Sequence, residues 1–282
     1  MKLIRHGPPG AEKPGLVDID GQLRDLSGHV RDVTGSVLDD RSLDRLRDVD
    51  PQSLPLVARD SRLGPCVGEV GKVVCVGLNY SDHAAETGAP TPKEPILFFK
   101  ATSAISGPND SVMIPRDSLR TDWEVELGIV IGSEVRYVEE ADALSHVAGY
   151  CVVNDVSERD FQTKRGGQWV KGKSADTFCP LGPWLVTRDE VPDPQGLDMW
   201  LDVNGERRQD SSTSNMIFSA AFLVSYISRF MSLQAGDVIA TGTPAGVGMG
   251  RNPQVWLAAG QTMRLGIQGL GEQRQLVVAW PG

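Results

Sequence analysis

From about residue 72 to its end, the chain consists of short apolar runs separated by turn residues, and this pattern constrains the fold more than any other feature. Runs rich in Val, Ile, Leu and aromatic residues, bounded by Gly, Pro, Asn and Asp, are typical of β-strands. They do not alternate with helices as in a βαβ chain, so we predict a mixed but mainly β fold. The predicted strands are 73–77, 96–99, 124–131, 149–153, 200–203, 237–241, 263–267 and 276–279.

One helix is expected among these strands, over residues 215–231, with Ser214 as its N-cap. Its apolar residues recur at helical spacing and predict a core helix that packs on a sheet. This stripe consists of Met216, Ala220, Leu223, Ile227 and Phe230.

The first third of the chain predicts a separate small unit. Residues 15–26 predict a hairpin with Asp20-Gly21 at its turn, and a helix is expected near 42–49. Prolines and glycines in 50–55 and 62–71 are typical of a connector. A chain of 282 residues exceeds the usual size of one domain. We therefore predict two domains, a small N-terminal α/β domain with connector (1–71) and a larger domain (72–282).

Composition excludes several classes of protein. The formal charge of −9 without any basic cluster argues against a nucleic-acid partner. The most apolar stretch, near 218–231, is interrupted by serines and an arginine, so no membrane span is expected. The N-terminus lacks the apolar run of a secretory signal, and we expect a cytoplasmic protein. Four cysteines without a C-x-x-C pair are expected to be buried thiols; they are Cys66, Cys75, Cys151 and Cys179.

The strongest local signal is the alternating segment 123–131. In a strand, Glu124 and Glu126 point to the same face. At roughly 7 Å and an effective dielectric near 20, their repulsion is about 2 kcal/mol, which a bound cation would turn into attraction. Asp155, just after the predicted strand 149–153, offers a third carboxylate. Such an all-oxygen site suits Mg²⁺ or Mn²⁺ and not Zn²⁺, whereas a solvated polar face is the alternative interpretation.

A second constellation lies in 79–88, where a short helix capped by Ser81 or Asp82 is expected. His83 and Glu86 are three residues apart and would share a helix face. A carboxylate beside an imidazole fixes its tautomer and raises its basicity, which is typical of a general base acting on water. The alternative is an ordinary surface pair.

The segment 241–248 combines glycines with threonines after a predicted strand. Gly242 and Thr243 lie where backbone N–H groups can approach an anion, so this loop is a candidate cradle for a substrate carboxylate. The alternative is an ordinary tight loop that binds no ligand, which the composition supports nearly as well.

Residues 167–174 match the phosphate-binding pattern G-x-x-x-x-G-K-S without its usual context of a preceding strand and a following helix. We therefore do not expect nucleotide binding. Lys173 remains a candidate for contact with an oxyanion, and a surface lysine is the alternative.

Several motifs together resemble the fumarylacetoacetate hydrolase family. They occur in matching order over roughly residues 72–280, and the N-terminal segment LIRHGPPGAEKPGLVD is similar to the bacterial subgroup labelled ureidoglycolate lyase or 2,4-diketo-3-deoxy-L-fuconate hydrolase. The motifs are GLNYSDHAAE, FFKA, DWEVELGIVIG, GYCVVNDVSERDFQ, KGKSADTF and GDVIATGTPAGVG. The resemblance implies a β-roll catalytic domain over 72–282, a small N-terminal domain, a homodimer and a divalent ion, usually Mg²⁺.

The resemblance also implies roles for individual residues. Those implied as metal ligands are Glu124, Glu126 and Asp155; the catalytic set is His83, Glu86 and Lys173; the substrate-binding set is Arg159, Gln162, Thr243 and Gly242. Lys100 is a weaker match to a family position.

We expect hydrolysis of a carbon–carbon bond in a 2,4-diketo acid such as 2,4-diketo-3-deoxy-L-fuconate, releasing pyruvate. Small keto or hydroxy acids are the expected partners. Ureidoglycolate lyase activity, oxaloacetate decarboxylation and enol-acid isomerisation are enzymatic alternatives, because each substrate can chelate the same ion. A metal- or ligand-binding protein without turnover is the non-enzymatic alternative.

Overall fold

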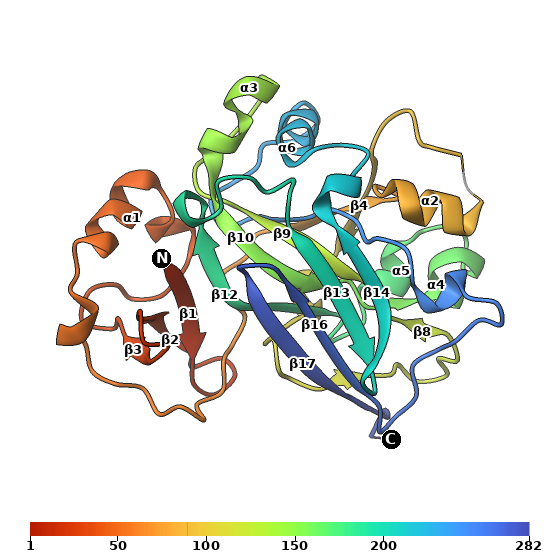
Figure 1. Ribbon diagram of the computed structural model, residues 1–282, viewed down its shortest axis with the longest axis horizontal. Coiled ribbons are helices and arrows are strands. Elements are labelled where there is room, and N and C mark those ends of the chain that lie inside the picture. Colours follow the sequence, from red (N-terminus) through yellow and green to blue (C-terminus); the bar gives the residue numbers. More distant parts are fainter. Residues whose placement is uncertain (89, 282) are drawn as a thin grey trace.

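The computed structural model describes residues 1–88 and 90–281 and is mainly β (Figure 1). The helices are α1 (Asp40–Arg47), α2 (Ser81–Thr87), α3 (Glu140–Ala143), α4 (Arg159–Lys164), α5 (Val170–Lys173) and α6 (Ala220–Ser228). The strands are β1 (Lys2–His6), β2 (Lys13–Val17), β3 (Leu23–Asp25), β4 (Val73–Gly77), β5 (Ile96–Lys100), β6 (Ile105–Ser106), β7 (Val112–Met113), β8 (Thr121–Asp122), β9 (Val125–Ile131), β10 (Val147–Asn154), β11 (Ser157–Glu158), β12 (Cys179–Thr187), β13 (Asp198–Val203), β14 (Glu206–Ser212), β15 (Val238–Ala240), β16 (Thr262–Ile267) and β17 (Gly271–Val278). Each of the eight predicted strands overlaps one of these strands.

Two sheets dominate the arrangement. Within the described residues, the larger sheet has the order β3-β2-β1-β12-β10-β9-β15-β4-β5, with β6 paired to β12. The smaller sheet has the order β14-β13-β16-β17-β7 and lies in front of β9 and β10 in the view of Figure 1. Every residue of β9 and β10 is buried, because these central strands are covered on both faces. A charged side chain at the start of β9 is therefore held away from water.

The strand β12 was not predicted, and its two prolines, Pro180 and Pro183, are residues that rarely occur in a central strand. It nevertheless lies between β1 and β10. The register of β10 against β12 shifts between Tyr150 and Val152, so the segment that contains Pro183 falls at an irregularity of the ladder.

The N-terminal hairpin was predicted correctly, since β2 and β3 are antiparallel and flank Asp20-Gly21. The N-terminal strands are not a separate sheet, because β1 pairs with β12 and extends the larger sheet. The division into domains at 71/72 therefore stays a prediction.

The predicted helix 215–231 begins later than expected. Its N-cap is Ser219, which accepts a hydrogen bond from Phe222 N, and Ser214 lies in a 3₁₀ turn instead. Asn79 explains the difference: its side chain bonds both backbone groups of Phe218, at 2.8 and 3.1 Å, and holds the chain extended. Of the predicted stripe, Phe230 is 62% exposed and lies outside the core.

All four cysteines are buried free thiols, as predicted. None of the helices in the part of the chain that the structure describes is long and apolar enough to span a membrane.

Candidate metal centre and substrate pocket

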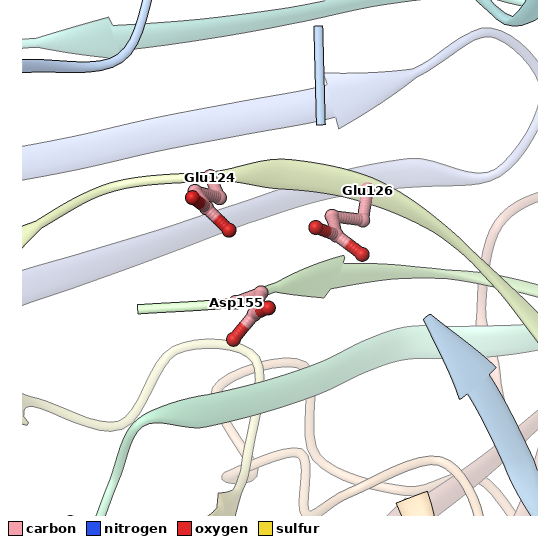
Figure 2. A group of neighbouring side chains, drawn as sticks. All are labelled: Glu124, Glu126 and Asp155. Atoms are coloured by element: carbon pink, nitrogen blue, oxygen red, sulfur yellow. The ribbon is translucent and has the colours of Figure 1, made fainter. Parts of the chain in front are cut away.

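Three carboxylates converge where β9 begins and β10 ends (Figure 2). The two strands are antiparallel with Asn154 opposite Val125, and the Asp155 amide donates to the Glu124 carbonyl at 2.9 Å. Glu126 lies two residues further along β9 and therefore points to the same side as Glu124. One carboxylate oxygen of each residue lies within 4.8 Å of the others, and all three side chains are buried.

Two buried lysines lie against this cluster. The Lys173 ammonium is 2.7 Å from Glu124 Oε2 and 2.8 Å from Asp155 Oδ2. Lys100 forms an ion pair with the other oxygen of Asp155 and donates to the Val156 carbonyl at 3.1 Å. The lysine of the G-x-x-x-x-G-K-S pattern is thus bound to carboxylates, and its helix α5 is a single turn. Both observations agree with the expectation that the pattern does not bind nucleotide.

A third cation, Arg159, links the cluster to the neighbouring Asp122. Its guanidinium is 2.7 Å from both Asp122 Oδ2 and Glu124 Oε1, and it donates to Gln162 Oε1 at 3.2 Å. Burial alone would raise the pKa of Glu124, but the charges of Lys173 and Arg159 outweigh burial and lower it to about 2. Glu124 is therefore held ionised.

Glu126 has a different environment. Burial, together with the negative charges of Asp155 and Glu124, raises its pKa well above the usual value. Its Oε2 accepts a hydrogen bond from Gly242 N at 2.9 Å, and no ion pair reaches it among the residues that the structure describes. One buried carboxylate thus lacks a balancing cation. The three all-oxygen side chains fit a hard divalent cation, which would supply that charge.

The predicted pair on α2 is in contact. His83 Nδ1 is 3.2 Å from Glu86 Oε2, and Gly246 N donates to both Glu86 oxygens at 3.0 and 3.1 Å. The N-cap of α2 is Tyr80 rather than Ser81 or Asp82, so that part of the prediction was wrong. Asp82 Oδ2 instead accepts from Ser211 Oγ at 2.6 Å, which ties the helix to the smaller sheet.

Residues of the loop after β15 donate hydrogen bonds that stabilise the site. Gly242 N donates to Glu126, and Thr243 Oγ1 donates to the Val125 carbonyl at 2.9 Å. At Gly242 the backbone has φ +99°, and a Cβ there would lie 2.8 Å from the Cβ of Asn79. Glycine is therefore required. A substrate-binding role for Gly242 and Thr243 stays a prediction.

A cavity of about 200 Å³ opens beside the carboxylates. Its polar lining consists of His83, Glu124, Glu126, Arg159, Gln162, Thr163, Lys173 and Thr243, and the rest is formed by Val76, Gly77, Leu78, Phe98, Trp169 and Met249. Most of the predicted site residues therefore line one pocket, whereas Asp155 and Glu86 lie behind it and contact the lining residues Lys173 and His83.

Residues 72–278 match the family model described as "Fumarylacetoacetate (FAA) hydrolase C-terminal". The chain belongs to the fumarylacetoacetate hydrolase family. A Burkholderia multivorans protein whose name carries the word hydrolase and no substrate is 63% identical over 280 residues, which are 99% of each chain. The mainly β fold of the fumarylacetoacetate hydrolase family is therefore confirmed, whereas nothing distinguishes the subgroup suggested by the N-terminal segment.

Solved structures of the family superpose over the whole chain. The fumarylacetoacetate hydrolase of Exiguobacterium antarcticum is 38% identical with a TM-score of 0.88, covering 99% of this chain and 100% of its own. The 2-hydroxyhepta-2,4-diene-1,7-dioate isomerase of Mycobacterium marinum is 33% identical with a TM-score of 0.75, covering 100% of both chains. Maleylpyruvate hydrolase from Sphingobium sp. SYK-6, in complex with manganese(II) and pyruvate, is 29% identical with a TM-score of 0.82, covering 99% of both chains.

Sequence reasoning missed three residues of this fumarylacetoacetate hydrolase family site. Asp122 is fully buried and accepts from Arg159, Gly248 N and Met249 N, so it joins the cluster to the 248–250 turn. Its position just before an apolar strand was the available signal. Phe98 and Trp169 pack against each other with ring centroids 5.3 Å apart and line the cavity. Aromatic residues carry no sequence signal that separates a pocket wall from a core.

Proposed function

We propose that this chain is a metal-dependent hydrolase that cleaves a carbon–carbon bond in a 2,4-diketo acid and releases pyruvate. One observation carries the proposal: two of three clustered buried carboxylates, including the one without a balancing cation, line the same small pocket as the histidine of a His–Glu pair. The related structure with manganese(II) and pyruvate supports the same chemistry.

We propose Glu124, Glu126 and Asp155 as ligands of Mg²⁺ or Mn²⁺, the hard cations that oxygen donors prefer. When bound, such an ion supplies positive charge to the carboxylate and 2-oxo oxygens of a keto acid and holds them in place. Lys173 and Arg159 keep Glu124 ionised, and Lys100 fixes one oxygen of Asp155.

His83 is the proposed general base. Its Nδ1 faces Glu86, so the pair favours the tautomer with its proton on Nδ1, in which Nε2 is the basic nitrogen; we propose that Nε2 takes the proton from water. The water oxygen bonds to the 4-oxo carbon, and the ammonium of Lys173 stabilises the resulting oxyanion. The bond between carbons 3 and 4 then breaks, its electron pair stays on carbon 3, and His83 returns the proton there. Water and the diketo acid thus give pyruvate and one carboxylic acid.

Arg159 and Gln162 are the proposed substrate-positioning residues, because both are buried and line the cavity beside Glu124. Thr243 and Gly242 act with them through the loop that contacts β9. Their hydrogen bonds fix the carboxylate cluster against which the keto acid binds.

Incubation of the purified protein with Mg²⁺ or Mn²⁺ and candidate acids tests the proposal. Pyruvate release from a 2,4-diketo acid, abolished by EDTA and restored by metal, is the expected result. If no diketo acid releases pyruvate, two other results would show that the protein is a lyase and not a hydrolase. These are the formation of glyoxylate and urea from ureidoglycolate, or of carbon dioxide from oxaloacetate. If none of the acids is turned over, the proposal is wrong and the protein is a metal-binding protein without catalytic activity.

We further propose a homodimer that forms through β5. This strand ends the larger sheet, and Ile96 and Phe99 on it are 37% and 40% exposed. An apolar, unpaired strand edge is a template for pairing with a second chain. Light scattering should therefore give a dimer for the native chain and a monomer for Phe99→Lys, whereas the control Phe230→Lys, just after the end of α6, stays dimeric.

A further inference from the structure

We propose that a basic surface at the mouth of the pocket attracts the anionic substrate and speeds its binding. This inference rests on the proposed hydrolase function, because a 2,4-diketo acid carries a carboxylate. We name this surface the basic rim, and its cations are Arg116, Arg120, Lys164, Arg165 and Lys171. None of the five belongs to the carboxylate cluster or to the dyad.

The pocket opens to solvent beside Thr163. Of the lining residues that the structure describes, Thr163 is the one that is exposed, whereas the others are buried or half-buried. Thr163 lies near the end of α4, and the two residues that follow it, Lys164 and Arg165, are also exposed. An acid that enters the pocket therefore passes these two cations.

The cations of the basic rim come together because α4 and α5 pack against each other. Lys171 on α5 is two residues from the pocket residue Lys173, and its ammonium donates to the Arg165 carbonyl at 2.6 Å. The Arg165 guanidinium lies over the Phe161 ring, 5.2 Å from its centroid. Arg116 joins this group, since it lines a surface hollow of about 380 Å³ with Phe161, Arg165 and Lys171.

The basic rim carries excess positive charge on an acidic protein. Three carboxylates lie among its five cations: Asp117 and Asp160 form ion pairs with rim cations, and the buried Glu158 caps α4. Arg165 and Lys171 form no ion pair within the described residues. Five cations and three carboxylates leave the rim with a charge of +2, whereas the whole chain carries −9.

This charge distribution decides how an anion approaches the protein. A chain of net charge −9 repels a carboxylate, and at 10 mM salt charges act over about 30 Å. Excess cations at the mouth reverse the sign of the potential where the substrate enters, which raises its local concentration and its rate of binding. Because the rim adjoins the mouth, part of this attraction persists at physiological salt, where the Debye length is about 8 Å.

Two double variants of the unpaired cations test the inference. At roughly 10 Å in water of 10 mM ionic strength, removing two unit charges weakens the attraction of a monoanion about threefold, and reversing both charges squares this to about ninefold. We therefore expect kcat/KM for 2,4-dioxopentanoate to fall by about these factors in Arg165→Gln/Lys171→Gln and in Arg165→Glu/Lys171→Glu. We expect kcat to stay native, and kcat/KM to return to the native value at 500 mM KCl, where salt screens the charges.

The matched control makes the same change of charge far from the mouth. Lys13→Glu/Arg41→Glu alters two exposed cations on β2 and α1, which lie at the opposite side of the molecule from α4 and α5 in Figure 1. Its kcat/KM at 10 mM ionic strength should fall by less than about twofold. An equal fall in the control shows an effect of net charge alone, and a fall in the rim variants that persists at 500 mM KCl shows lost contacts. Either result overturns the inference.

Failure of the proposed function is distinguishable from failure of the inference. If pyruvate is released but the rim variants keep native kcat/KM at low salt, the inference is wrong and the hydrolase function stands. If no acid releases pyruvate, the hydrolase proposal falls, and calorimetric titration of oxalate into the protein with Mn²⁺ decides the inference. Weaker oxalate binding by the rim variants at 10 mM but not at 500 mM ionic strength supports the basic rim. Equal binding by all proteins, or binding by none, refutes it.

Discussion

Removing the charge of Glu126 should stabilise the metal-free protein and abolish its response to metal. At 4.8 Å and an effective dielectric near 20, one pair of carboxylates repels by about 3.5 kcal/mol. Glu126 faces two such partners, and the cations paired with them, Lys100, Arg159 and Lys173, offset most of this repulsion. A net relief on the order of 2 kcal/mol remains for Glu126→Gln.

The matched control is Glu124→Gln, which removes the same charge from a carboxylate with two cation partners. Lowering the pKa of Glu124 from 4.5 to about 2 corresponds to roughly 3 kcal/mol of stability, which this variant loses. The two isosteric changes thus have opposite signs. At about 2–4 °C per kcal/mol, we expect a melting temperature higher by ~4–8 °C for Glu126→Gln and lower by ~6–12 °C for Glu124→Gln in EDTA.

The pH dependence follows from the two pKa directions. Because the pKa of Glu126 is raised in the folded state, ionisation of this group destabilises the metal-free protein as pH rises above about 4.5. The gain in stability from Glu126→Gln is therefore present at neutral pH and vanishes near pH 4. The pKa of Glu124 is lowered, so its contribution is present above about pH 4.5 and is lost as pH falls toward 2.

Thermal unfolding with EDTA or Mn²⁺ measures both effects. A metal at 100 times its Kd stabilises the native protein by about 2.7 kcal/mol, and neither variant should show this gain. A lower melting temperature of Glu126→Gln in EDTA, or an equal Mn²⁺ shift in variant and native protein, would refute the charge argument.

Three further predictions concern the dyad and the metal. His83→Ala should lower kcat by about 10²–10⁴-fold and leave Mn²⁺ affinity by calorimetry unchanged, and full activity would exclude His83 as the base. Gly250→Ala should lower kcat with little change in melting temperature, because its Cβ would lie 2.6 Å from Glu86 Oε2 and displace the dyad; native turnover would show that Glu86 does not orient His83. EDTA should abolish pyruvate release and Mn²⁺ should restore it, and turnover that persists after exhaustive chelation would contradict a metal role.

Strand positions and the carboxylate cluster followed from local pattern. The alternation around Glu124 and Glu126 depends on the two-residue repeat of a strand, and Asp155 was found because it ends an apolar run. The start of α6 did not follow, because Asn79, far away in sequence, holds Phe218 extended. The strand β12 did not follow either, because no local pattern indicates a central strand that contains Pro183, which lies where the pairing with β10 is irregular.

By itself, the sequence determined which residue types lie on which strand face, and hence that three carboxylates could meet. Only the tertiary structure decided the charge balance of these carboxylates. Three cations form ion pairs with the neighbouring acidic residues, whereas Glu126 has no cation partner among the described residues. The tertiary structure also packed Phe98 and Trp169 against each other in the wall of the cavity beside these charges. The physical reason is that periodicity reports the direction of a side chain along one strand, whereas ion pairs and pocket walls form between segments whose approach no local pattern encodes.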